Sequence, residues 1–250
     1  MNVSFWPKGW AFQAYKDILV DKIFLRAVVN TILVTICVTV LNLVIDIMAA
    51  YAFSKKFYGK SFFNYYFVIT MYFSGGLIPF YLLVTKYLHL QNTYFSLILP
   101  ALVNVFYIIV IRTQIQAIPA SLTEAAIIDG ATQSQVLFRV VVPSIIPTIA
   151  AIGMFIALGT WNSWFNVMIF INDNKLWTLQ YFLRKIVTEK MLTSSMRESY
   201  QRMLELGTVE ITPENYQMAA IVLVALPIVC IYPFVQKYFV KGILVGSVKE

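Results

Sequence analysis

Residues 27–53 read AVVNTILVTICVTVLNLVIDIMAAYAF, and this stretch decides the fold. Asp46 is its one charged residue. A helix needs about 20 apolar residues to cross the hydrocarbon core of a bilayer. The run is continuously apolar, whereas the strands of a membrane barrel alternate between apolar and polar positions. We therefore predict that residues 27–53 form a transmembrane helix.

Four more stretches of this kind follow along the chain, at residues 62–84, 94–115, 142–171 and 216–234. The 250 residues are 60% hydrophobic and 12% charged, against roughly 45–50% and about 25% in soluble domains. This composition excludes an ordinary soluble protein. The predicted fold class is an all-α integral membrane protein with five transmembrane helices, multi-pass in the cell membrane, whose transmembrane domain covers residues 27–240.

The charges of the connecting loops predict the orientation. The short loop 54–61 contains three lysines, and cytoplasmic loops carry an excess of Lys and Arg. This places the insert 116–141 and the tail 241–250 in the cytoplasm, and the N-terminal segment 1–26 and the loop 172–215 outside. Six basic residues in the loop 172–215 and four in the segment 1–26 favour the opposite orientation, so charge alone leaves it open. The loop 172–215 also contains acidic residues, which indicates a small folded surface element.

Several other functions are disfavoured by the sequence. The net charge of +7 is scattered over the termini and loops, so no nucleic-acid partner is expected. Cys37 and Cys230 lie in apolar runs, and His89 has no ligand-type neighbours at metal-binding spacing, so no metal site is expected. Gly59-Lys60 lacks the earlier glycine of a phosphate-binding loop, so this chain does not bind ATP in that way.

The insert 116–141 contains the most specific pattern in the chain. We predict a short helix there that Pro119 and Ser121 start, with Ser121 as the capping residue and Glu124 completing a Ser-x-x-Glu capping box. Gly130 is expected to end this helix, and Pro143 to stand at the beginning of the next span. A short polar-flanked helix with small alanines on one side, held outside the membrane, is suited to lie in the groove of a partner protein.

The spacing Glu124-Ala125-Ala126-x3-Gly130-x9-Val140-x-Val142-Pro143 resembles the EAA loop of permease subunits of ATP-binding-cassette importers. The family usually has Ile and Leu where Val140 and Val142 stand. Further resemblances are Asn30-Thr31, Ala49-Ala50-Tyr51-Ala52-Phe53-Ser54, Ile78-Pro79, Asn92-Thr93-Tyr94, Ile118-Pro119, Trp161-Asn162-Ser163-Trp164 and Val240-Lys241-Gly242. Together they resemble the binding-protein-dependent carbohydrate importers of the maltose-permease type, in particular the oligosaccharide branch of Gram-positive bacteria.

This resemblance implies a transmembrane subunit of an ATP-driven sugar importer rather than an enzyme. It implies no catalytic residue and no cofactor in this chain, with ATP and Mg on an ATPase dimer. The other implied partners are a second permease, in a heterodimer rather than a homodimer, an extracellular sugar-binding lipoprotein and membrane lipid. The residues implied to couple to the ATPase are Glu124, Ala125, Ala126, Gly130 and Pro143.

The resemblance also bears on the spans. The family places the EAA loop in the cytoplasm, which supports the orientation that charge left open. It usually has six spans, so the five predicted here correspond to its second to sixth. We expect the first to lie upstream of this sequence or to be absent, because the polar segment 1–26 has no apolar core of its own.

The fourth predicted span contains the candidate substrate path, formed by Trp161, Asn162, Trp164 and Asn166. On one continuous helix, Trp161 and Phe165 share a face and the two asparagines share another. Aromatic rings stack on sugars and amides bond their hydroxyl groups. The alternative is an aromatic belt at the outer membrane interface.

Two alternatives to an ATP-driven importer remain. An ion-coupled secondary transporter subunit would require several buried acids, whereas within the spans Asp46 is the one prominent candidate. We expect Asp46, together with Asn42 one turn before it, to make a packing contact with another helix. A membrane-embedded hydrolase would require a histidine within a span, and no predicted span contains one.

Overall fold

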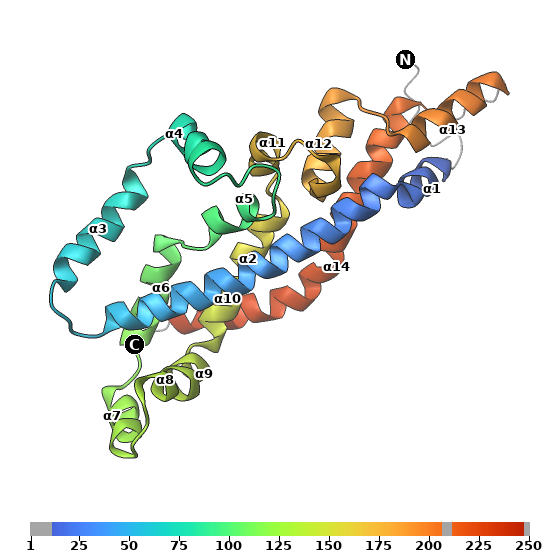
Figure 1. The fold of residues 1–250 in the computed structure, drawn as a ribbon. Helices are drawn as coiled ribbons and strands as arrows, with labels where there is room; N and C mark the ends of the chain where they lie inside the picture. Colours follow the sequence, from blue (N-terminus) through green and yellow to red (C-terminus); the bar gives the residue numbers. More distant parts are fainter. Residues whose placement is uncertain (1–11, 207–211, 248–250) are drawn as a thin grey trace. The chain divides into compact units, whose positions relative to one another are not determined.

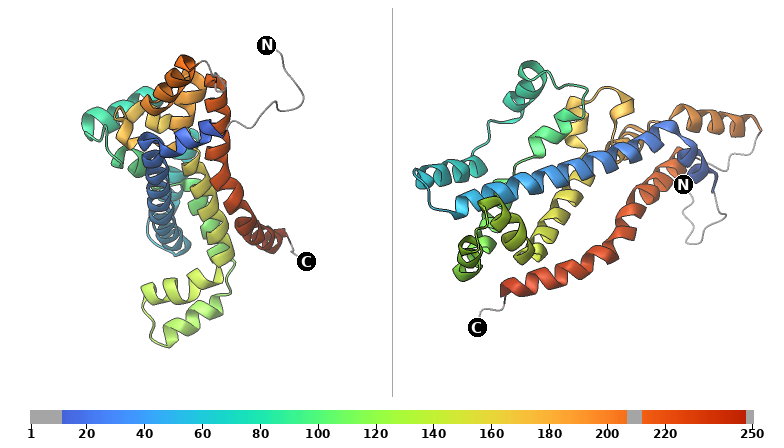
Figure 2. Two further views of the ribbon diagram at one scale, coloured as in Figure 1. Left: turned by 90° about the vertical axis from the view of Figure 1, so that its right-hand side faces the viewer. Right: turned by 60° about the horizontal axis from the view of Figure 1, so that its bottom comes forward.

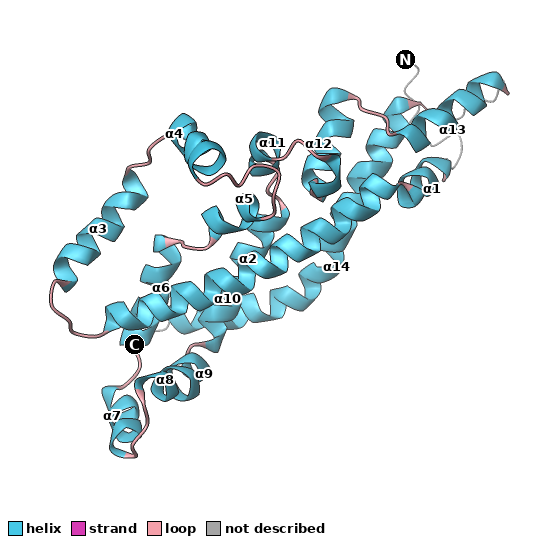
Figure 3. Cartoon of the chain, viewed as in Figure 1, coloured by secondary structure: helices cyan, strands magenta, loops and turns pink. Residues whose placement is uncertain are grey.

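The computed structural model describes residues 12–206 and 212–247, with side chains described in these ranges except at 195 and 231–247. These ranges contain helices and loops but no strand (Figure 3). The α-helices are α1 Gln13–Val20, α2 Lys22–Ser54, α3 Lys60–Tyr72, α4 Leu77–Leu82, α5 Phe95–Ile98, α6 Val105–Gln116, α7 Ala120–Ile128, α8 Gln133–Val136, α9 Val142–Ser144, α10 Ile146–Trp161, α11 Phe165–Phe170, α12 Leu179–Glu189, α13 Ser194–Glu205 and α14 Pro213–Ser247 (Figure 1). Short π-helical turns occupy Leu83–Tyr87 and Leu137–Val141, and 3₁₀ turns occupy Leu99–Ala101 and Asn174–Leu176. The all-α prediction is confirmed.

Two helices in the described ranges are long and apolar enough to cross a membrane unbroken, namely α2 and Pro213–Cys230 of α14. Three further spans exist if each of three bent helix pairs is counted as one, which gives up to five. The bends measure 107° between Lys60–Tyr72 and Leu77–Tyr87, 44° between Phe95–Ala101 and Val105–Gln116, and 83° between Gln133–Ser144 and Ile146–Trp161. The predicted spans at residues 62–84, 94–115 and 142–171 are therefore each broken by a bend. Hydropathy reports which residues avoid water and carries no information about a change of direction.

Both long helices extend beyond the predicted spans. Helix α2 begins at Lys22 rather than at residue 27, because the Asp21 carboxylate caps it: Oδ1 accepts from the backbone N–H groups of Ile23 at 2.7 Å and Phe24 at 3.0 Å. Part of the predicted external segment 1–26 is therefore helical, in α1 and the start of α2, and residues 1–11 lie outside the described residues. Helix α14 continues through most of the predicted tail 241–250, of which 248–250 are not described.

The chain forms two compact units, one made of residues 1–33 and 161–232 and the other of residues 34–160 and 233–250. The core of the first unit is built from α1, the first turns of α2, α12, α13 and the start of α14. Tyr216 lies fully buried there and its hydroxyl donates to Asp17 Oδ2 at 2.7 Å. The predicted folded element in the loop 172–215 is confirmed, since α12 and α13 lie in it.

The Asn30-Thr31 pair has a defined role within the first unit. The Asn30 amide donates to the backbone carbonyls of Lys175 at 2.8 Å and Trp177 at 2.9 Å. The Thr31 hydroxyl accepts the N–H of Leu179 at 2.8 Å. These bonds fix the start of α12 against α2, in a place where unpaired backbone groups would be costly.

The second unit contains the remainder of α2 and the helices α3 to α10. Gly153 lets α10 approach α2 closely, because a Cβ atom at this position would lie 3.0 Å from Leu43 Cδ1. The Asn42 amide donates to the carbonyl of Ala101 at 2.7 Å, and Asp46 Oδ1 accepts the N–H of Asn104 at 3.2 Å. The predicted packing contact through Asn42 and Asp46 is confirmed, and its partner is the bend between α5 and α6.

Candidate functional site

Helix α7 is the short helix predicted in the insert, and Gly130 ends it. Asp129 is the last residue with partly helical geometry, and Gly130 follows in the left-handed region with φ +82°. The N–H of Gly130 donates to Ile127 O at 3.0 Å and that of Ala131 donates to Ala126 O at 2.9 Å. This pair of bonds is a Schellman motif, which favours glycine at the position after the C-cap. The prediction that Gly130 terminates the helix is confirmed.

The predicted capping box at Ser121 and Glu124 is wrong. Pro119 is the N-cap residue of α7 and no side chain caps the helix. Because proline presets its own φ, the helix begins directly after it and Ser121 lies inside the first turn. A capping box does occur further on, at the start of α8. There Thr132 Oγ1 accepts from Gln135 N at 3.4 Å, and Gln135 Oε1 accepts from Thr132 N at 2.8 Å.

The surface of α7 is open. None of its residues is buried, and Leu122, Ile127 and Ile128 are exposed, Ile128 by 85%. Glu124 and Ala125 are exposed and Ala126 is half-buried. The ion pairs in the described ranges, Lys185–Glu189 and Arg202–Glu198, do not involve Glu124. A short helix that exposes three large apolar side chains is unusual for a solvent-facing loop and is typical of a contact surface.

The rest of the insert attaches α7 to the helices of its own unit. Helices α7 and α8 lie side by side (Figure 2). Val136 at the end of α8 is buried, as are Leu137 and Val141 in the π-helical turn that follows. The Tyr51 hydroxyl, close to the end of α2, donates to Gln133 Oε1 at the start of α8 at 2.7 Å. The insert is therefore held on one side and open on the other.

Pro143 lies in α9, where the helical segment 133–144 ends, and Ile145 separates it from α10 at the 83° bend. The prediction that Pro143 stands at the beginning of the fourth span is therefore wrong, because the helical segment starts at Gln133 and Pro143 lies just before the bend.

The predicted arrangement of the substrate-path residues on one helix is wrong. Helix α10 ends at Trp161 and α11 begins at Phe165, so Asn162 and Trp164 lie in the connection between them. Only Asn166 lies on α11. The asparagine and serine between the two tryptophans compete with the helix for backbone hydrogen bonds, which favours a break here.

These residues instead meet helix α12 within the first unit. Asn162 Oδ1 accepts from Gln180 Nε2 at 3.1 Å. The Arg184 guanidinium lies 3.8 Å from the centre of the Trp164 ring, a cation–π contact. Trp161 packs against the core of the unit, and its buried indole N–H has no hydrogen-bond partner in the described ranges. Asn166 is half-buried.

A second aromatic group lies at the start of α12, formed by Trp177 just before the helix and Tyr181 within it. The rings of Trp177 and Tyr181 are 5.2 Å apart and nearly perpendicular. The Lys185 ammonium lies 5.8 Å from the first ring and 5.5 Å from the second. Its hydrogen bond to Glu189, at 2.7 Å, raises the pKa of Lys185 above its ordinary value. Lys185 is therefore positively charged at neutral pH.

Sequence reasoning missed three residues of these sites. Tyr51 was quoted as part of a motif, without a predicted contact. Gln180 and Arg184 belong to an amphipathic helix, and the sequence does not indicate which residues it contacts. No group of three or more potential metal ligands occurs in the ranges that the structure describes.

A bundle of apolar helices with an exposed, capped helix between two spans defines a membrane-embedded subunit that works with other proteins. Residues 47–245 match the family model described as "Binding-protein-dependent transport system inner membrane component". The chain belongs to this family. It is therefore a membrane component of a transport system and not an enzyme.

Similar proteins agree with this assignment. The chain is 37% identical to Protein LplC of Bacillus subtilis over 97% of this chain and 80% of the relative. It is 36% identical to the polygalacturonan/rhamnogalacturonan transport system permease protein YtcP of the same organism, over 97% of this chain and 83% of the relative. Among solved structures, a bacterial ABC transporter involved in the import of the acidic polysaccharide alginate contains a similar chain. That chain has a TM-score of 0.84 and 33% identity, with 91% of this chain and 79% of that chain covered.

Proposed function

We propose that this chain forms half of the translocation path of an ATP-driven, binding-protein-dependent importer of oligosaccharides. The observation that carries the proposal is helix α7, which has no buried residue and ends at a Schellman turn, within a chain of the binding-protein-dependent family. Its partners in this proposal are a second permease in a heterodimer, an ATPase dimer that holds ATP and Mg, and an extracellular sugar-binding lipoprotein.

In the proposed mechanism α7 lies in a groove of the ATPase and transmits its closure to the helices. Leu122, Ile127 and Ile128 supply the apolar contact area. The Schellman turn at Gly130 and the bond from Tyr51 to Gln133 keep α7 from moving independently of its unit. The helices have two arrangements in this mechanism. ATP binding favours one of them, because a ligand shifts the equilibrium towards the state that it binds more tightly.

The proposed cargo is an oligosaccharide. The relative YtcP is named for the transport of polygalacturonan and rhamnogalacturonan, and the similar solved chain comes from a transporter involved in the import of alginate. The aromatic and amide side chains around Trp164 and Asn162 have the chemistry that sugars need, since flat rings contact sugar faces and amides pair with hydroxyl groups. The alternative of an outer aromatic belt predicts no effect of these residues on sugar affinity.

Purification of the chain from native membranes tests the assembly, and reconstitution of the purified complex tests the activity. We expect an ATPase, a second permease and a sugar-binding lipoprotein to co-purify, and sugar uptake into vesicles to require ATP. Uptake driven by an ion gradient without ATP would support the ion-coupled alternative and contradict the proposal. Membership in a binding-protein-dependent family argues against that alternative.

A further inference from the structure

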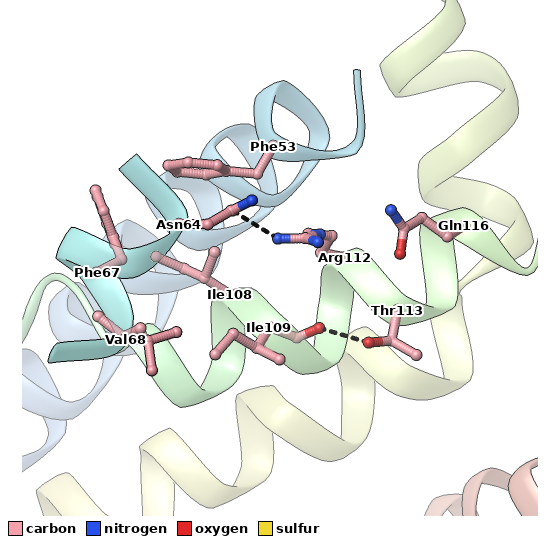
Figure 4. A pocket seen from close by; sticks show the side chains of 10 residues that line it. Phe53, Asn64, Phe67, Val68, Ile108, Ile109, Arg112, Thr113 and Gln116 are labelled. Carbon is pink, nitrogen blue, oxygen red and sulfur yellow. Dashed lines mark hydrogen bonds between the residues drawn. The ribbon is translucent and has the colours of Figure 1, made fainter. Parts of the chain in front are cut away.

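A cavity of about 290 Å³ opens between α3 and α6 in the second unit, and no step of the proposed transport uses it. Its walls combine Phe53 from the end of α2 with Asn64 and Phe67 from α3 and Ile109, Arg112 and Gln116 from α6. Figure 4 shows Asn64 and Arg112 pointing toward one another across it, with aromatic rings beside them. The cavity is thus apolar around one cation.

Arg112 has no acidic partner from the part of the chain that builds this cavity. Its Nη1 donates to the neutral amide oxygen of Asn64 at 2.8 Å. The sequence contains no Asp or Glu from residue 47 to residue 123, which includes every residue that lines the cavity. Neither ion pair in the described ranges involves Arg112. A half-buried guanidinium near the membrane interface favours an anionic partner, because the pairing offsets the cost of its desolvation.

The depth of Arg112 indicates which anion is available. Arg112 lies four residues before the last residue of α6, and Asn64 lies four residues after the first residue of α3. At 1.5 Å per residue, both lie about 6 Å inside the helix ends. Lys55, Lys56 and Lys60 lie at or before the start of α3, and the α7 insert follows α6. With these loops in the cytoplasm, the cavity opens at the level of the inner-leaflet headgroups.

We propose that this cavity binds the phosphate headgroup of an anionic phospholipid from the cytoplasmic leaflet. The Arg112 guanidinium donates to the phosphate oxygens, a geometry that arginine satisfies with two parallel bonds. The Asn64 amide oxygen holds the guanidinium in place. Phe53, Phe67 and Ile109 contact the glycerol and the upper acyl chains, which a free phosphate ion lacks. The inference rests on the membrane orientation and does not depend on the cargo.

The test is native mass spectrometry of the purified transporter, titrated separately with phosphatidylglycerol and phosphatidylcholine. We expect wild type to bind phosphatidylglycerol in preference to phosphatidylcholine, and Arg112→Gln to bind it about tenfold more weakly at one site. Lys56→Gln is the matched control. It removes the same charge from an exposed residue of the adjoining loop, outside the cavity, and is expected to change the affinity by less than about twofold.

A second variant covers the case in which Arg112→Gln does not assemble. Asn64→Leu keeps the arginine and removes the bond that orients it, so it is expected to weaken phosphatidylglycerol binding in the same direction. Three results would overturn the proposal. The first is equal binding of the two lipids, and the second is unchanged phosphatidylglycerol affinity in both variants. The third is that millimolar inorganic phosphate saturates the site with the same affinity as phosphatidylglycerol. A disulfide or cross-link from Asn64→Cys to an acidic segment of the second permease would also contradict the proposal, because that segment and not a lipid would then occupy the cavity. Lipid affinity is measured without transport, so this test can fail while sugar uptake stays intact.

Discussion

The Tyr51 hydroxyl donates a 2.7 Å hydrogen bond to the side chain of Gln133. Tyr51 lies in the last turn of α2, and Gln133 is the first residue of α8, the helix that follows the exposed α7. The bond joins two segments 82 residues apart, at the point where a movement of the insert would reach α2.

Removal of this hydroxyl is expected to weaken coupling without unfolding the protein. Tyr51→Phe keeps the ring and loses one hydrogen bond, worth about 1 kcal/mol. We expect sugar uptake per ATP hydrolysed to fall severalfold in reconstituted vesicles, with unchanged assembly. Tyr58→Phe is the control, because Tyr58 is fully exposed in the adjoining loop. An unchanged ratio of uptake to hydrolysis in Tyr51→Phe would contradict a coupling role for the bond.

Gly130 is expected to tolerate asparagine and to reject leucine. Its φ of +82° lies in the left-handed region, and a Cβ atom there would meet nothing within 4 Å. The cost of a larger residue is therefore backbone strain, about 1–2 kcal/mol for leucine and less for asparagine. Gly130→Leu should uncouple hydrolysis from uptake, whereas Gly130→Asn should retain most of the uptake. Normal sugar uptake in Gly130→Leu, with sugar-stimulated hydrolysis retained, would show that the turn is not needed.

Asp46 is expected to be structural. It is fully buried in α2 and accepts the N–H of Asn104, the residue that caps α6. Asp46→Leu leaves that N–H without its acceptor, which costs about 1–3 kcal/mol, while Asp46→Asn retains the oxygen. A lower thermal unfolding temperature is expected for the leucine variant alone. If the asparagine variant instead abolished uptake at normal stability, the charge of Asp46 would have a role in transport.

The residues around Trp164 test the substrate path. Asn162→Ala and Trp164→Ala are expected to weaken sugar-stimulated uptake about tenfold through a higher apparent KM, with normal assembly. Met168→Ala, at an exposed position of α11, is the control. Equal KM values in all three variants would favour the aromatic belt.

The apolar runs predicted where the spans lie, and the glycine after Asp129 predicted where the short helix ends. Both depend on local properties, namely hydropathy and the φ angle that only glycine adopts without strain. The bends were missed for a different reason. Ser74-Gly75-Gly76 lies within an otherwise apolar run, so hydropathy alone predicts one continuous span there. In the structure Gly76 has φ +87° and lies between α3 and α4.

Contacts between distant segments could not be predicted from one sequence. Two such contacts are Tyr51 with Gln133 and Trp164 with Arg184. The residues on either side of each one in the sequence do not indicate which distant residue it contacts. The wrong capping box has the same origin. Ser121 has the correct spacing to Glu124, but Pro119 is the N-cap residue, so the helix starts two residues earlier than the capping box requires.

The most direct test of the proposed function is a cross-link from α7. With Cys37 and Cys230 replaced by serine, Ile128→Cys places a thiol on the most exposed apolar residue of the helix. A short bifunctional reagent added to membrane vesicles should join it to the ATPase subunit in the assembled transporter, and Tyr58→Cys should give no such product. Labelling of Ile128→Cys by a membrane-impermeant reagent from outside intact cells, without a cross-link to the ATPase, would contradict the account.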